Sequence, residues 1–104
     1  MGEMQETPDG QLLRDYADCG HESAFREIVT RYADLVYSAA LRQVESSAAA
    51  CDIAQSVFTD LARKAGTLAS EGGTAKSLAR WLHRATRYAA LNHLRDKRRW
   101  QERN

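Results

Sequence analysis

A near-absence of proline is the feature that most restricts what this chain can fold into. The single proline is Pro8, and the rest of the chain is rich in Ala, Leu, Arg and Glu, which favour α-helix. Beyond the first residues, glycines stand at a few places where a helix can end: Gly10, Gly20, Gly66, Gly72 and Gly73. No segment shows the strict apolar–polar alternation expected of a strand. The sequence therefore predicts an all-α fold.

Apolar residues at steps of three and four divide the chain into about four expected helices. The first is short, with Asp9 suited to cap its start and Gly20 suited to close it. The second spans about residues 23–44. Its inward stripe contains Phe25, Ile28, Val29, Tyr32, Leu35, Val36 and Ala39.

Two further helices are expected in the second half of the chain. The third covers roughly residues 48–65, capped by either serine of residues 46–47 and stopped by Gly66. Residues 67–75 are expected to form a flexible loop, and the fourth helix begins near Lys76 and continues to the C-terminus. Because short connections make successive helices antiparallel neighbours, these helices should pack as a compact bundle.

The length of 104 residues gives room for one small domain, expected at residues 9–104 after a disordered tail at residues 1–8. The longest apolar runs are far shorter than the roughly 20 residues that span a bilayer, and the acidic start is unlike a secretory signal. With only two cysteines, the chain is expected to be cytoplasmic with reduced thiols.

Neither an enzyme nor a metal site is indicated. Cys19 and His21 are close in sequence, but no second ligand pair with zinc-like spacing follows. His83 and His93 are far from His21, and no nucleophile motif, phosphate-binding loop or pair of carboxylates at metal-binding spacing is present. We therefore expect no catalysis, no metal and no cofactor.

Charge is divided unevenly along the chain. Residues 76–104 contain nine of the fifteen Lys and Arg residues and two of the fourteen acids, for a net charge of +7. The first 75 residues contain six basic and twelve acidic residues, for a net charge of −6. The net charge of +1 therefore results from two parts of the chain that carry large charges of opposite sign.

The basic residues of the fourth helix should form one stripe, because they recur mostly at steps of three and four. They are Lys76, Arg80, Arg84, Arg87, Arg95 and Arg98. On the opposite side fall Leu78, Trp81, Leu82, Ala85 and Ala89. Such a helix can bury one face and offer the other to phosphates, although a merely solvated arginine-rich face would look the same. Leu91 and Leu94 lie on the basic side, so either another element covers them or the helix bends.

Several short segments follow one another in a recognisable order. They are AF at residues 24–25, RYADLVY at 31–37, DIAQSVF at 52–58, WL at 81–82, LR at 94–95 and RR at 98–99. In this order and on an all-helical pattern they resemble region 2 of bacterial RNA polymerase sigma factors, specifically the extracytoplasmic-function group. The resemblance covers about residues 9–99 and implies a transcription initiation factor.

In that family the outer surface of the third helix docks on a coiled coil of the polymerase clamp. The resemblance implies that Asp52 and Gln55 are polar contacts there, and Cys51 and Ser56 belong to the same surface. Relatives often have acidic residues at these last two positions, so the affinity for polymerase is expected to differ. Without the resemblance, all four would be read as solvated helix-surface residues.

The family's fourth helix and the loop before it face the minus-ten promoter element. The resemblance implies a DNA-binding set of Lys76, Arg80, Trp81, His83, Arg84, Arg87, Tyr88, Arg95 and Arg98. Residues 67–75 would hold bases of the melted non-template strand, because stacking and charge suit single-stranded DNA. Trp81 also borders the apolar face, and we favour a packing role for it.

Some residues depart from the family pattern. Leu78 and Arg80 stand where housekeeping sigma factors have aromatic residues that help separate the strands, which implies weaker melting. Tyr88 and Asn92 replace residues that are often Asn and Asp. The base preference of relatives therefore does not transfer to this chain.

Core RNA polymerase and promoter DNA are the implied partners, and an anti-sigma factor is a further candidate. These sigma factors also have a second helical domain that reads the minus-thirty-five element, so we expect the 104 residues to be a domain of a longer protein. Two other classes stay open. One is an interaction adaptor whose basic face binds an acidic partner; the other is a non-specific DNA-binding domain, against which the acidic first 75 residues argue.

Overall fold

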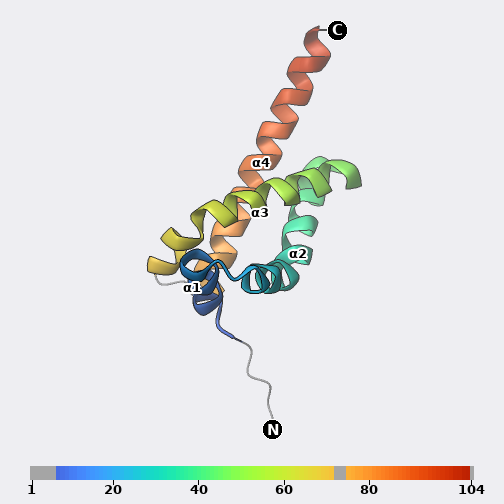
Figure 1. The fold of residues 1–104 in the computed structure, drawn as a ribbon. Helices are drawn as coiled ribbons and strands as arrows, with labels where there is room; N and C mark the ends of the chain where they lie inside the picture. The colour runs from blue at the N-terminus through green and yellow to red at the C-terminus, as the bar shows by residue number, and fades with distance from the viewer. Residues whose placement is uncertain (1–6, 72–74, 104) are drawn as a thin grey trace.

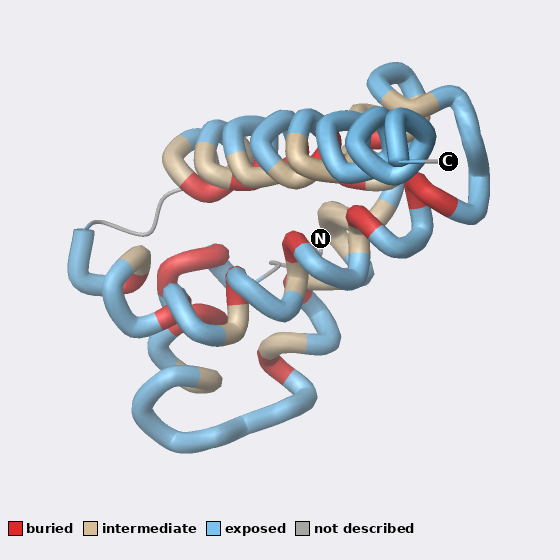
Figure 2. Tube along the Cα trace, turned by 90° about the horizontal axis from the view of Figure 1, so that it is seen from above, coloured by how far each residue is buried: buried red, intermediate tan, exposed pale blue. Residues whose placement is uncertain are grey.

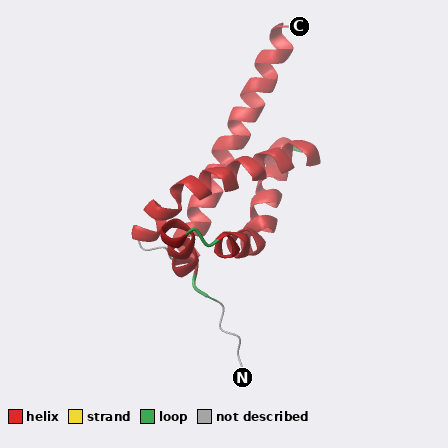
Figure 3. Ribbon diagram, in the orientation of Figure 1, coloured by secondary structure: helices red, strands yellow, loops and turns green. Residues whose placement is uncertain are grey.

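A computed structural model of the protein describes residues 7–71 and 75–103, and every element in this part is an α-helix. The helices are α1 (Asp9–Cys19), α2 (Glu22–Val44), α3 (Ser47–Ser70) and α4 (Ala75–Arg103), and short loops join α1 to α2 and α2 to α3 (Figure 1 and Figure 3). The predicted all-α bundle is confirmed. Most of the expected tail at residues 1–8 lies outside the described residues.

The two ends of α1 differ in how well they were predicted. Gly20 closes the helix in the left-handed region (φ 70°), and its N–H donates to the Tyr16 carbonyl at 3.0 Å. The start is a correction, because Pro8 is the N-cap residue and Asp9 is already the first helical residue. Asp9 does not cap α1, since its carboxylate is bound by charged and polar groups of α2.

Those groups are Arg31 and Tyr32, which hold the buried start of α1 against the middle of α2. The Arg31 guanidinium donates to Asp9 Oδ1 at 2.9 Å, and the Tyr32 hydroxyl donates to Asp9 Oδ2. Arg31 also pairs with Glu27 at 3.2 Å. Only 4% of the Asp9 side chain is exposed, so this carboxylate is a buried charge with its partners in place.

The α3 helix begins as predicted and ends later. Ser46 caps it, with its hydroxyl oxygen accepting from the Ala49 N–H at 3.3 Å. Gly66 does not stop the helix, which continues to Ser70. The extra turn is stable because Ala69 is buried, and the Ser70 hydroxyl donates to the Gly66 carbonyl at 2.8 Å. The expected loop at 67–75 is therefore helical over 67–70, and its residues 72–74 lie outside the described residues.

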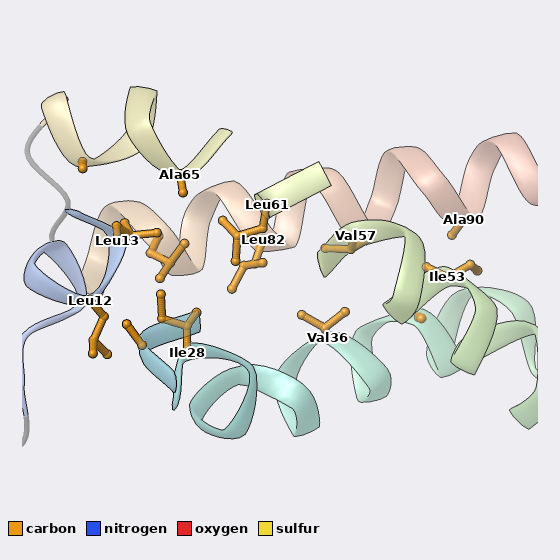
Figure 4. Packing of buried hydrophobic residues seen from close by; sticks show 14 of the residues in the cluster. Leu12, Leu13, Ile28, Val36, Ile53, Val57, Leu61, Ala65, Leu82 and Ala90 are labelled. Carbon is orange, nitrogen blue, oxygen red and sulfur yellow. The ribbon is translucent and has the colours of Figure 1, made fainter. Parts of the chain in front are cut away.

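All four helices contribute to one core. Figure 2 shows the buried stretches turned toward the space between the helices, and Figure 4 shows side chains of the different helices meeting there. The largest fully buried apolar side chains are Leu13, Ile28, Val36, Val57, Leu61, Leu78 and Leu82. This is the arrangement that the apolar stripes predict.

The end of α4 projects away from the other three helices (Figure 1). At about 1.5 Å per residue the helix is about 43 Å long, and every described residue from Leu94 onward is exposed. Its last turns therefore stand in solvent on all sides. None of the described helices combines the length and the apolar character that a membrane span needs.

Candidate functional site

The outward face of α4 carries the predicted basic stripe. All six members, Lys76, Arg80, Arg84, Arg87, Arg95 and Arg98, are exposed. The inward face is a row at steps of four, formed by Leu78, Leu82, Thr86 and Ala90, all buried. Within the described part of the chain, none of the six cations is in an ion pair. Their charge is therefore available to an anionic partner.

Other predicted DNA-binding residues of α4 lie at the border of this face. His83 is exposed, and 68% of Tyr88 is exposed. Trp81 is half-buried and packs against the core, in agreement with the packing role favoured for it. Leu78 is fully buried, so its side chain cannot act as a wedge between bases.

The outer ridge of α3 carries the predicted docking residues, Cys51, Asp52, Gln55 and Ser56, all exposed. The Asp52 side chain forms neither a hydrogen bond nor an ion pair with any other described residue. The ridge has a groove on each side. A partner lying along α3 would therefore meet polar groups at the centre and a depression on either flank.

The groove between α2 and α3 is mainly apolar and has a volume of about 620 Å³. It is lined by Phe25, Val29, Ala33, Ala54, Gln55, Phe58, Thr59 and Ala62. Gln55 and Thr59 form its polar edge on the ridge. Apolar side chains of a docked helix could be buried here while Gln55 fixes their register.

The groove between α3 and α4 is polar and smaller, about 260 Å³. Asp52, Ser56 and Asp60 line it from α3, and Tyr88, Asn92 and His93 line it from α4, with Ile53, Ala85 and Ala89 at its floor. The structure thus brings predicted docking residues and a predicted DNA-binding residue into one groove. Cys51, Lys76 and Arg80 take no part in it.

Asp60 and His93 were missed by the sequence prediction. Asp60 follows Asp52 and Ser56 at steps of four, which was a visible signal of one helix edge. The spacing does not show that this edge lies against α4. Arg95 donates to Asn92 Oδ1, an interaction within α4 that fixes the amide at the rim of the groove.

Metal-ligand chemistry is absent from the described residues, where no group of three or more His, Cys, Asp or Glu side chains could hold an ion. Cys19 and Cys51 are both exposed thiols without a disulfide. The candidate site therefore consists of the cations of α4, the exposed polar groups of α3 and the two grooves beside α3.

A comparison with protein families matches residues 28–100 to the model described as Sigma-70 region 2. The chain belongs to this family. The match runs from the first turns of α2 through α3 to Trp100 of α4, and so includes both the ridge and the basic stripe. Comparison with curated proteins found no match, and comparison with solved structures found none either.

The sigma-70 region 2 family is a family of transcription factor domains and not a family of catalytic enzymes. It supports a sigma-factor role in binding RNA polymerase and in promoter melting. The exposed α4 cations and the exposed α3 ridge are the two surfaces on which such a role can depend.

Proposed function

We propose that this sigma region 2 domain is of the extracytoplasmic-function type. In this proposal the α3 ridge docks on the clamp coiled coil of core RNA polymerase, and α4 recognises the minus-ten element and helps to melt it. One observation carries the proposal: α4 exposes a cationic face directly opposite its buried face, with no ion pair to any described acid, in a chain that belongs to the sigma family.

The docking half of the proposal rests on the α3 ridge. Asp52 and Gln55 are exposed polar residues on its two sides, one facing each groove. The apolar groove beside Gln55 includes Phe58, whose partly buried ring contacts the core. Apolar surface flanked by polar groups is typical of a protein interface in which area gives affinity and hydrogen bonds give register.

Alanine substitution of both Asp52 and Gln55 tests the docking surface. Binding to purified core polymerase should weaken by about tenfold to a hundredfold, because a few interface residues supply most of the binding energy. Asp18→Ala on α1, an exposed carboxylate away from the ridge, is the matched control and should bind normally. Circular dichroism should show the same helix content for all three proteins. Normal binding by the double variant would exclude the ridge as the docking site.

The DNA-binding half rests on the α4 stripe. Arg84 and Arg87 are exposed, unpaired with any described acid, and one turn apart, so both can reach phosphates or base edges of the same DNA site. Lys76 and Arg80 extend the same face toward the start of the helix. The residues at 67–75 precede it, and in this proposal they hold bases of the melted strand.

Single substitutions Arg84→Ala and Arg87→Ala test the stripe. Each should lower affinity for a minus-ten-like oligonucleotide and flatten the dependence of log affinity on log salt by about one unit, because each removes one phosphate contact. Arg26→Ala on α2 makes the same charge change on another surface and should leave the salt slope unchanged. Equal effects of all three substitutions would show that only net charge matters. A domain that bound core polymerase but showed no preference among DNA sequences would fit the adaptor class instead.

A further inference from the structure

Exposed apolar side chains share the outward face of α4 with its arginines. Tyr88, Leu91 and Leu94 are 68%, 53% and 38% exposed, respectively, and Leu91 lies between Arg84 and Arg95 on one side and Arg87 on the other. The helix continues through this region, and the described elements leave more than half of Leu91 exposed. A face that only met phosphates would gain nothing from an exposed leucine at this place.

Leu91 lies at the centre of this face. It follows the fully buried Leu82 by nine residues, which at about 100° per residue places it half a turn around the helix, directly away from the core. Arg84 and Arg95 lie about 20° and 40° to one side of it, and Arg87 about 40° to the other. The side chain that points directly away from the core is therefore apolar, with a cation on each side of it.

This pattern requires a partner that has negative charge on two sides and an apolar group between them. The major groove of duplex DNA meets this requirement, because phosphates line both edges and the C5-methyl group of thymine points into the groove between them. The groove is about 12 Å wide, which matches a helix about 10–12 Å in diameter. An anionic membrane surface fits less well, because interfacial helices have a broad apolar face rather than a few apolar residues among arginines.

We propose that Leu91 is a specificity-determining residue that contacts a thymine methyl group in the duplex beside the melted minus-ten element. Arg84 and Arg87 bind the phosphates on the two sides and hold the helix in the groove. This inference rests on the proposed DNA-binding function of α4 and adds to it the base group that is read.

A thymine-to-uracil scan tests the contact, because deoxyuridine lacks only the methyl group. Preferred duplexes are first selected from a random pool by the chain bound to core RNA polymerase, and each thymine is then replaced singly. We expect one position at which the replacement lowers wild-type affinity by about fourfold, the value for one buried methyl group. Leu91→Ala should bind both duplexes equally, and Leu91→Met should restore the difference. The half-exposed position of Leu91 makes both variants compatible with the fold, which circular dichroism checks.

The possible results separate this inference from the proposed function. If no thymine position responds, or if Leu91→Ala keeps the response, the inference is wrong, and a loss of affinity in Arg84→Ala would still support DNA binding by α4. If no duplex is selected, or if Arg84→Ala has no effect on any duplex, both the inference about Leu91 and the proposed DNA binding by α4 are wrong. Binding of wild type to vesicles containing anionic lipid, lost in Leu91→Ala and without any uracil effect, would assign the face to a membrane surface instead.

Discussion

Asp9 lies in the first turn of α1, but its carboxylate is bound by Arg31 and Tyr32 of α2. A buried charge is costly unless it is paired and hydrogen-bonded, and here both carboxylate oxygens have a partner. The cluster therefore fixes where α1 begins and how it lies on α2. Arg31 and Tyr32 are among the residues that resemble the sigma family, and the structure gives them a physical role.

Removal of the Asp9 carboxylate should destabilise the domain. We expect Asp9→Ala to lower the free energy of unfolding by about 2–3 kcal/mol, because the Tyr32 hydroxyl loses its hydrogen-bond acceptor and Arg31 loses its ion pair with Asp9. Asp18→Ala, an exposed substitution on the same helix, should change it by less than about 0.5 kcal/mol. Urea denaturation followed by circular dichroism measures both. Equal stabilities would show that the cluster contributes nothing net.

Tyr32 should make stability depend on pH in the alkaline range. Burial, together with the hydrogen bond to the Asp9 carboxylate and its negative charge, raises the pKa of Tyr32 from 10.0 to about 12. Above pH 10 the unfolded chain releases this proton while the folded protein retains it, so ionisation favours unfolding. The contribution of Tyr32 is fully present below pH 10 and is lost as pH rises through about 12.

Tyr32→Phe isolates this effect. At pH 8 the variant should be less stable than wild type by about 1 kcal/mol, the value of a lost hydrogen bond. The difference should shrink between pH 10 and 12 as wild type loses the contribution of its protonated tyrosine. Urea denaturation at pH 8, 10 and 11 measures it, and stability curves that stay parallel over this range would contradict the assignment.

Sequence reasoning could not have found this cluster, since Asp9 and Arg31 are 22 residues apart and belong to different helices. The local signal at Asp9 was that of a helix cap, which is where isolated aspartates before a helix usually act. The tertiary ion pair outweighed that local preference. Only the packing of α1 on α2 shows it.

At the scale of whole helices, the apolar stripes predicted all four elements because each helix buries one face. The exception is the end of α3, where Gly66 was expected to stop the helix. A Cβ atom placed on Gly66 would lie 3.6 Å from the Cβ of Ala17, so this glycine lies beside α1 within a continuing helix. The buried Ala69 beyond it stabilises the added turn, and that burial depends on neighbours that the local sequence does not reveal.

Gly66 inside α3 and Gly20 at the end of α1 should respond oppositely to substitution by alanine. Gly66→Ala should stabilise the domain by about 0.5–1 kcal/mol, because the new methyl group makes an ordinary contact with Ala17 and alanine favours the helix interior. Gly20→Ala should destabilise it by about 1 kcal/mol, because its φ of 70° disfavours residues that have a Cβ. Thermal and urea denaturation of the two variants measure the changes. Destabilisation by Gly66→Ala would show that α1 and α3 lie closer than described.

Across the whole molecule, the sequence predicted the α3 ridge and the α4 stripe as exposed faces, but it did not predict that they lie next to each other. The period of α3 and of α4 separates exposed from buried residues, so the ridge and the stripe followed from sequence alone. The groove that joins Asp52 to Tyr88 depends on the placement of α3 against α4, for which single-helix periodicity has no signal. The exposed Leu91 was likewise visible in the pattern, but its lack of cover among the described elements was not.

The projecting end of α4 should matter for DNA binding and not for folding. A chain ending at Asp96 loses Lys97, Arg98, Arg99 and Arg103 but no buried residue, so its Tm should stay within about 2 °C of wild type. Its affinity for DNA and the salt dependence of that affinity should both fall. Leu82→Ala provides the contrast, since its core cavity should cost about 2–5 kcal/mol of stability. A large drop in Tm on truncation would show that the last turns take part in the fold.

Because α4 is one continuous helix, a small rotation of its buried part displaces its projecting end by a larger distance. The buried part is the segment around Leu82, and the projecting part extends to Trp100, about 27 Å away at 1.5 Å per residue. A tilt of the helix by about 10° at Leu82 displaces Trp100 by about 5 Å, roughly the pitch of one helical turn. Ala85 and Ala89, which lie at the floor of the groove beside Asp52, are close to this buried segment. If a partner docks on α3 as proposed, a small repacking at the groove would therefore move the cationic end of α4 by several ångströms.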